Sequence, residues 1–129
     1  MTEPVWVERA ALVHLHNQSL ARHGGPAGLR DEGLLDSALA RPRNRFEYEG
    51  VDDLCELAAT YAVAIAKNHP FIDGNKRAAF SAMGVFLRSN GLRLVSSSDA
   101  ATDLLLGVAA GGIDIGEAAA GLRANTALA

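Results

Sequence analysis

The stretch that decides the fold is AIAKNHPFIDGNKRAAF, residues 64–80. Alanine-rich apolar sequence with helical spacing lies on both sides of the polar run 69–77. A turn between two helices needs only proline, glycine or asparagine. The histidine, the acid and the two cations in this run therefore require another explanation. We interpret residues 69–77 as the candidate functional site.

The two helices beside this run have the clearest periodicity in the chain. Apolar residues recur at steps of three and four from Asp52 or Asp53 to Asn68, which predicts a broadly buried helix. A second helix is predicted from about Asn75 to Ser89, with Gly91 as the glycine that follows its end.

The N-terminal part predicts two further helices and one irregular segment. The first helix runs from Pro4 to about His23 and ends at a glycine pair. Asp31 caps a short second helix, which Pro42 stops. Residues 41–50, RPRNRFEYEG, are expected to be irregular, as a short hairpin or an exposed flap.

The C-terminal part predicts two more helices. One begins at Ser98 or Asp99, and the last runs from Ile115 to Arg123, with a tail at 125–129 that frays. Residues 92–96, LRLVS, resemble a strand but are too few to make a sheet. The prediction is an all-α fold, a single domain over residues 1–129 with six or seven helices around one core.

Composition excludes several classes of protein. The chain has 129 residues, half of them hydrophobic, and a net charge of −3, so no basic field indicates nucleic acid as a partner. The single cysteine, Cys55, excludes an internal disulfide and is expected in the core. No signal peptide and no apolar run of ~20 residues is present, which predicts a cytoplasmic protein without a membrane span.

The polar run has the features of a phosphate site. The second helix begins here, and its first N–H groups lack intrahelical partners and carry partial positive charge. Gly74 admits a ligand close to the backbone, Asn75 can donate through its amide, and Lys76 and Arg77 supply full charges.

The acid and the histidine extend this interpretation. Asp73 would repel a bare phosphate, so it indicates Mg²⁺ between the two, with a nucleotide as ligand. His69 lies at the other end of the run, and histidine is a side chain that can take a proton from an attacking hydroxyl. Phe71 and Ile72 are expected to point partly into the core and fix the loop.

Each residue also has a purely structural interpretation. His69 could cap a helix and Asp73 could shape a turn, although the whole set within nine residues is harder to explain this way. His14 and His16 face different sides of a helix and make a poor metal pair, and His23 is expected as a C-terminal cap. The arginines of residues 41–45 either lie in a solvated loop or hold a target segment.

The run HPFIDGNKR closely resembles the signature of the Fic/Doc family, H-x-F-x-[D/E]-[G/A]-N-[G/K]-R. GLRDEGLLDSALARP, residues 28–42, is similar to the stretch before this signature in death-on-curing (Doc) toxins. The resemblance implies the helical Fic fold, with the active-site loop between two central helices, and transfer of part of a nucleoside triphosphate to a protein hydroxyl. It implies these roles: His69 as general base, Phe71 as loop anchor, Asp73 as Mg²⁺ ligand, Gly74, Asn75 and Lys76 as anion hole, and Arg77 as phosphate ligand.

Two departures from the adenylyl-transferring pattern favour the Doc type. Lys76 replaces a glycine, and Phe80 replaces a second arginine. The resemblance then implies a toxin kinase that moves the γ-phosphate of ATP to a translation elongation factor and arrests translation. Asp73-Gly74 is closer to the Fic pattern, so protein adenylyl transfer (AMPylation) remains an alternative. A degenerate member that only binds nucleotide or protein is a second alternative.

The self-inhibitory motif of many Fic proteins, [S/T]-x-x-x-E-[G/N], is absent. Two glutamates are followed by glycine, Glu32 and Glu49, and the residues four positions before them are Gly28 and Arg45, neither of which is serine or threonine. The resemblance therefore implies a separate antitoxin protein as a partner.

Overall fold

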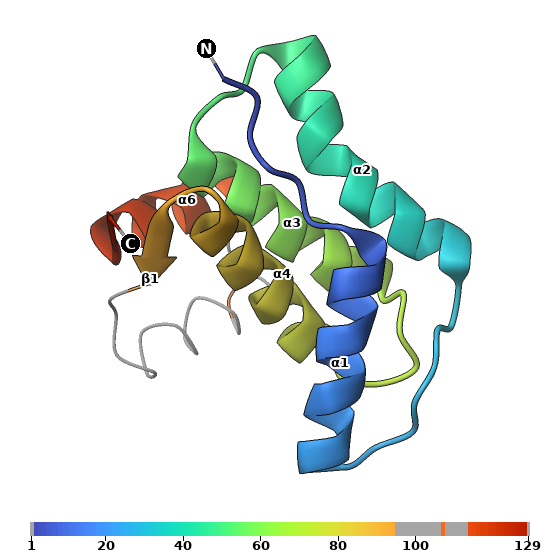
Figure 1. The fold of residues 1–129 in the computed structure, drawn as a ribbon. Helices are drawn as coiled ribbons and strands as arrows, with labels where there is room; N and C mark the ends of the chain where they lie inside the picture. The colour runs from blue at the N-terminus through green and yellow to red at the C-terminus, as the bar shows by residue number, and fades with distance from the viewer. Residues whose placement is uncertain (1, 95–106, 108–113, 129) are drawn as a thin grey trace.

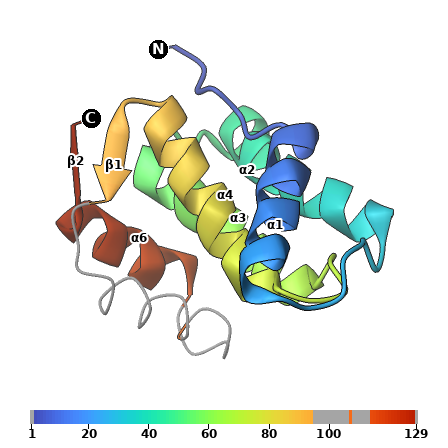
Figure 2. The same ribbon diagram turned by 60° about the horizontal axis from the view of Figure 1, so that its bottom comes forward.

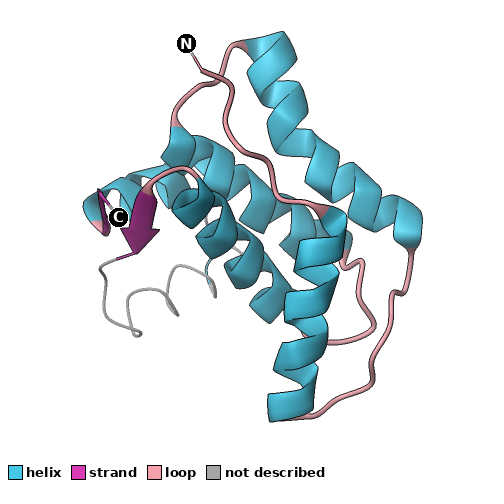
Figure 3. Ribbon diagram, viewed as in Figure 1, coloured by secondary structure: helices cyan, strands magenta, loops and turns pink. Residues whose placement is uncertain are grey.

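The computed structural model describes residues 2–94, 107 and 114–128. This part of the chain contains five labelled helices and a two-stranded sheet (Figures 1 and 3). The helix predicted from Ser98 or Asp99 lies outside the described residues. The elements are α1 (Arg9–His23), α2 (Glu32–Glu49), α3 (Leu54–Asn68), α4 (Asn75–Ser89), β1 (Leu92–Leu94), α6 (Ile115–Ala124) and β2 (Thr126–Leu128).

Helix α3 is the centre of the fold. It packs against α2, α4 and α6, while α1 packs on α4 (Figures 1 and 2). Most of its residues are buried, among them Cys55 as predicted, because apolar side chains cover nearly its whole circumference. This confirms the mainly helical fold and the buried helix that leads to the polar run. No helix in the described part of the chain has the length and apolar character that crossing a membrane requires.

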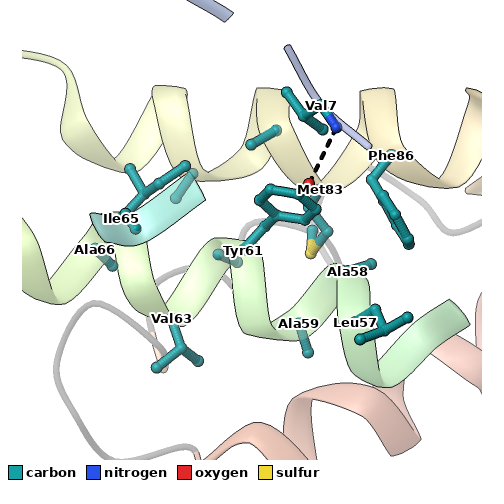
Figure 4. Packing of buried hydrophobic residues seen from close by; sticks show 14 of the residues in the cluster. Val7, Leu57, Ala58, Ala59, Tyr61, Val63, Ile65, Ala66, Met83 and Phe86 are labelled. Atoms are coloured by element: carbon teal, nitrogen blue, oxygen red, sulfur yellow. Dashed lines mark hydrogen bonds between the residues drawn. The ribbon is translucent and has the colours of Figure 1, made fainter. Parts of the chain in front are cut away.

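The N-terminal segment is extended up to Glu8, so the prediction of a helix from Pro4 is wrong. Its main chain bonds to other elements instead of to itself. The Val7 N–H donates to the Tyr61 hydroxyl over 3.0 Å (Figure 4), and the Val5 N–H donates to Asn90 Oδ1 over 2.7 Å. These contacts tie the segment to α3 and α4, and α1 begins at Arg9.

Helix α2 continues through Pro42, so the predicted stop and the irregular segment after it are both wrong. Pro42 is buried within the helix and removes only one backbone donor. The following turns are held by side chains, because Arg45 donates to Thr60 Oγ1 over 2.8 Å and to Glu56 over 2.9 Å. Residues 41–49 are therefore helical and form no hairpin or flap.

The described part of the C-terminal tail, residues 125–128, does not fray as predicted. Residues Thr126–Leu128 form β2, which pairs antiparallel with β1 through Leu92↔Leu128, Arg93↔Ala127 and Leu94↔Thr126 (Figure 2). Pairing satisfies the main-chain groups that a free tail would expose to water. The prediction that residues 92–96 make no sheet is wrong for residues 92–94, because the tail supplies the partner strand; residues 95 and 96 lie outside the described residues.

Candidate active site

A pocket of about 590 Å³ lies where the end of α1 meets the loop between α3 and α4. Figure 2 shows these segments at the same end of the molecule. All the candidate site residues from the sequence except Phe71 line this pocket. It is lined by His23, Gly24, Gly25, His69, Ile72, Asp73, Gly74, Asn75, Lys76 and Arg77.

The start of α4 presents free backbone donors to this pocket. Gly74 precedes the helix with φ 76° and ψ 24°, and no side chain caps the end. The first intrahelical bond at this end runs from the Ala78 N–H to the Gly74 carbonyl, 2.9 Å. Within the described part of the chain, nothing accepts from the N–H groups of residues 75–77. They make a positively polarised end suited to an anion.

Two cations stand beside these donors. Neither Lys76 nor Arg77 has an acidic partner within 4.0 Å among the described residues, and the buried Arg77 Nε has no hydrogen-bond partner there. The guanidinium lies over Gly74, since a Cβ at that glycine would stand 3.2 Å from Arg77 Nη2. Positive φ and close approach together require glycine at position 74. The site thus holds positive charge that no acidic side chain among the described residues pairs with.

The Asp73 carboxylate lies at the edge of the pocket. Its Oδ1 accepts from the Gly74 N–H over 2.8 Å, and its Oδ2 packs so close to Gly25 that a Cβ there would collide with it. Among the described residues no group of three or more His, Cys, Asp or Glu side chains could hold a metal. One carboxylate beside a helix end suited to phosphate nevertheless fits Mg²⁺, which takes one or two carboxylates and completes its shell with phosphate oxygens and water.

His69 ends α3 in the left-handed conformation, with φ 50° and ψ 55°. It is the only non-glycine residue with positive φ in the part of the chain that the structure describes. This conformation costs about 1–2 kcal/mol for a residue with a Cβ. The imidazole is exposed, and its Nδ1 lies 3.3 Å from Asn75 Nδ2.

This contact bears on the proton of the His69 ring. An amide nitrogen only donates, so it favours an unprotonated Nδ1 and a hydrogen on Nε2. To accept a proton at Nε2, the ring needs the tautomer with its hydrogen on Nδ1. That tautomer loses the 3.3 Å contact between Nδ1 and Asn75 Nδ2. The ring is exposed to water, through which it can exchange that proton.

The Asn75 side chain organises the loop. It accepts from the Phe71 N–H and donates to the Phe71 carbonyl, both over 2.9 Å. Phe71 is 2% exposed and points into the core as predicted, whereas Ile72 is 53% exposed, so the prediction that it too points into the core is wrong. Because the Asn75 amide is engaged in this way, the anion-binding role predicted for this residue would depend on its main-chain N–H.

His16, His23 and the glycine pair 24–25 are parts of the site that sequence reasoning did not assign to it. The buried His16 ring stacks on Phe71 at 3.9 Å between centroids and would meet a Cβ at Gly74 at 2.8 Å. Both of its nitrogens lack a partner among the described residues. Burial is the main cause that lowers the pKa of this imidazole. The nearby Asp73 backbone acts in the opposite direction and raises the pKa. The available signal was a glycine pair directly after a helix.

Comparisons with known proteins identify the family of this chain. The model of the Fic/DOC family matches residues 6–87. "Protein kinase doc" of Escherichia phage P1 is 40% identical over 112 residues, which cover 87% of this chain and 88% of that protein. "Toxin Doc" of Mycolicibacterium smegmatis is 38% identical over 109 residues, 82% of this chain and 84% of that protein. The chain belongs to the Fic/Doc family.

Proposed function

We propose that this chain is a Doc-type toxin that transfers the γ-phosphate of ATP to a hydroxyl group of a target protein. The observation that carries the proposal is the pocket itself. It combines N–H groups and two cations at the start of α4, none of which has a partner in the described part of the chain, with the His69 imidazole on the opposite side of the loop. The relative from phage P1 is named a protein kinase, which supports phosphoryl transfer rather than transfer of another part of the nucleotide.

Each residue of the pocket has a distinct role in the proposed transfer. The α4 N–H groups, Lys76 and Arg77 bind and orient the triphosphate, and they stabilise charge on the transferred group. His69 takes the proton of the attacking hydroxyl, which makes that oxygen a better nucleophile. Asp73 would hold Mg²⁺, which supplies neutralising charge between the phosphates when it is bound.

Control by a separate antitoxin is part of the proposal. The relative named "Toxin Doc" supports toxicity, and the chain lacks the self-inhibitory motif. Of the two glutamates followed by glycine, Glu32 begins α2 and pairs with Arg9, and Glu49 ends α2 next to Arg45. The start of α2 lies at the pocket end of α3, because Asn68 Nδ2 donates to the Leu34 carbonyl over 3.0 Å. An 18-residue helix spans about 27 Å, so Glu49 is far from the pocket.

The acceptor is proposed from the resemblance alone. We propose a translation elongation factor, whose modification would arrest translation. Incubating the protein with a bacterial lysate and ATP labelled at either the α- or the γ-phosphate tests the transfer. Label from γ-ATP alone on one protein band supports the proposal. Label from α-ATP would establish adenylyl transfer instead. If folded protein transfers no label, the remaining alternative is a member of the family that only binds nucleotide or protein.

Lys76 is expected to separate phosphoryl from adenylyl transfer. Its long charged side chain lines the pocket where the adenylyl-transferring pattern has glycine. Lys76→Gly should reduce γ-label transfer and allow a small amount of α-label to reach protein, because the pose of the triphosphate decides which phosphorus is attacked. Transfer of α-label by the unmodified protein would contradict this role. Arg88→Gly, in the exposed last turn of α4, is the matched control.

A further inference from the structure

The segment before α2 holds the strained end of α3. Main-chain hydrogen bonds join the two stretches: Ile72 N–H to the Gly28 carbonyl at 3.1 Å, and Arg30 N–H to the Pro70 carbonyl at 2.7 Å. Leu29 and Phe71 form an antiparallel bridge between them. The active-site loop is therefore fixed from outside as well as by its own Asn75.

The Arg30 side chain adds two contacts at the catalytic position. Its Nε donates to the His69 carbonyl over 2.7 Å, and its Nη2 donates to the Asn68 carbonyl over 2.8 Å. These are two of the last carbonyls of α3, which have no helical partner. The cation also complements the negative end of the helix dipole.

These contacts act on a residue that would otherwise leave its conformation. A left-handed histidine persists only where its surroundings determine it. The His69 N–H is bonded to the Ile65 carbonyl at 3.1 Å, and its own carbonyl is bonded to Arg30, so both sides of the residue are fixed. Its ring is then steered by one long contact to Asn75, which leaves the backbone to set where the imidazole points.

We propose that Arg30 is a positioning residue for His69: its guanidinium fixes the left-handed backbone that aims the imidazole into the pocket. The role in transfer rests on the function proposed above, whereas the effect on His69 geometry does not. Arg30 does not line the pocket. Its loss should therefore lower turnover while ATP binding stays nearly the same.

The test compares Arg30→Ala and Arg30→Lys with Arg9→Ala. Arg9 is the matched control. Its bonds to Glu32 and Asp36 join α1 to the start of α2, as Arg30 joins the segment before α2 to α3, but they lie away from the loop between α3 and α4. Two quantities are measured: the NMR chemical shifts of the His69 backbone and ring, without nucleotide, and kcat and KM for ATP in γ-label transfer.

We expect the Arg30→Ala variant to show shifted His69 signals and a fall in kcat of up to about 10²-fold, as for small displacements of a catalytic group. KM for ATP should change less than about twofold, since the α4 end is untouched. Arg30→Lys, with its charge but without the planar fork, should lie between Ala and wild type. Arg9→Ala should match wild type in both measurements.

Unchanged His69 signals together with unchanged kcat in folded Arg30→Ala would overturn the proposal. Changes of the same size in the His69 signals and kcat of the control Arg9→Ala would also overturn it. If Arg30→Ala does not fold, Arg30→Lys decides: wild-type signals and kcat in that variant overturn it. If the wild type itself transfers no γ-label, the proposed function fails, while the NMR comparison still decides whether Arg30 sets the geometry of His69.

Discussion

The two ends of α3 are built in different ways. At its start the Asp53 side chain accepts from the Cys55 N–H at 2.9 Å, and Arg123 of α6 pairs with the same carboxylate. At its end no side chain from the helix itself closes the last turn. His69 is left-handed there, and Arg30, 39 residues earlier in the chain, binds its carbonyl.

The difference separates stability from function. The first end uses a cap that lies one residue before the helix, so it forms wherever the helix forms. The second end stores strain in one residue and relies on distant contacts to maintain it, as is common at functional sites. Variants at the second end should affect transfer more than folding, and variants at the first end the reverse.

The largest effect is expected for His69→Ala. Loss of a general base lowers the rate by about 10² to 10⁴-fold. The exposed ring contributes little packing, and the free energy of unfolding should stay close to that of wild type. Transfer of γ-label measures the rate, and urea unfolding measures the free energy of unfolding. His14→Ala, at an exposed position of α1, is the control. A soluble variant that transfers at the wild-type rate would show that His69 is not the base.

A pair of glycines tests the strain in the loop. Gly74→Ala should cost more stability than Gly50→Ala, because both have similar positive φ but only Gly74 lacks room for a Cβ. The shared backbone cost is about 1–2 kcal/mol. The contact of a Cβ with the His16 ring adds to it at Gly74 alone, and transfer should fall there too. Equal unfolding free energies for the two variants would contradict the crowded geometry around Gly74.

A smaller effect is expected in the core, at Tyr61→Phe. The Tyr61 hydroxyl accepts from the buried Val7 N–H, and an unpaired buried donor costs about 1–3 kcal/mol (Figure 4). Burial raises the pKa of Tyr61 above 10. The folded state therefore favours the neutral phenol, and the stability this gives is lost as pH rises above about 10. Thermal unfolding at neutral and alkaline pH measures both effects, and no loss at neutral pH would exclude the Val7 bond.

The smallest effect is expected at the first end of α3. Asp53→Ala removes a cap worth about 1 kcal/mol, and the exposed pair with Arg123 adds little. Transfer of γ-label should remain at the wild-type level. A large loss of transfer without loss of stability would mean that the two ends of α3 do not divide function and stability as described.

Local patterns predicted the helices that flank the site. The boundaries of α4 follow directly from the periodicity and from Gly74 and Gly91, and the nine-residue run identified most of the pocket lining. These features depend on neighbours within a few positions, which the sequence displays.

The remaining features depend on contacts between distant residues. Pro42 stays in α2 while Arg45 holds the next turn through Thr60 and Glu56, and β2 forms because β1 is available to it. The positions of His16 and Arg30 beside the loop likewise arise only when α1 and the segment before α2 pack against it. Contacts between residues far apart in the chain cannot be predicted from a local sequence pattern.

The central claim is that this pocket moves a γ-phosphate with His69 as the base. It is tested most directly by the intact mass of the labelled acceptor protein, purified and reacted with ATP and Mg²⁺ in the presence of wild type or His69→Ala. We predict a gain of one phosphoryl group with wild type and essentially none with the variant. A gain of one adenylyl group, or an equal phosphoryl gain with both proteins, would contradict it.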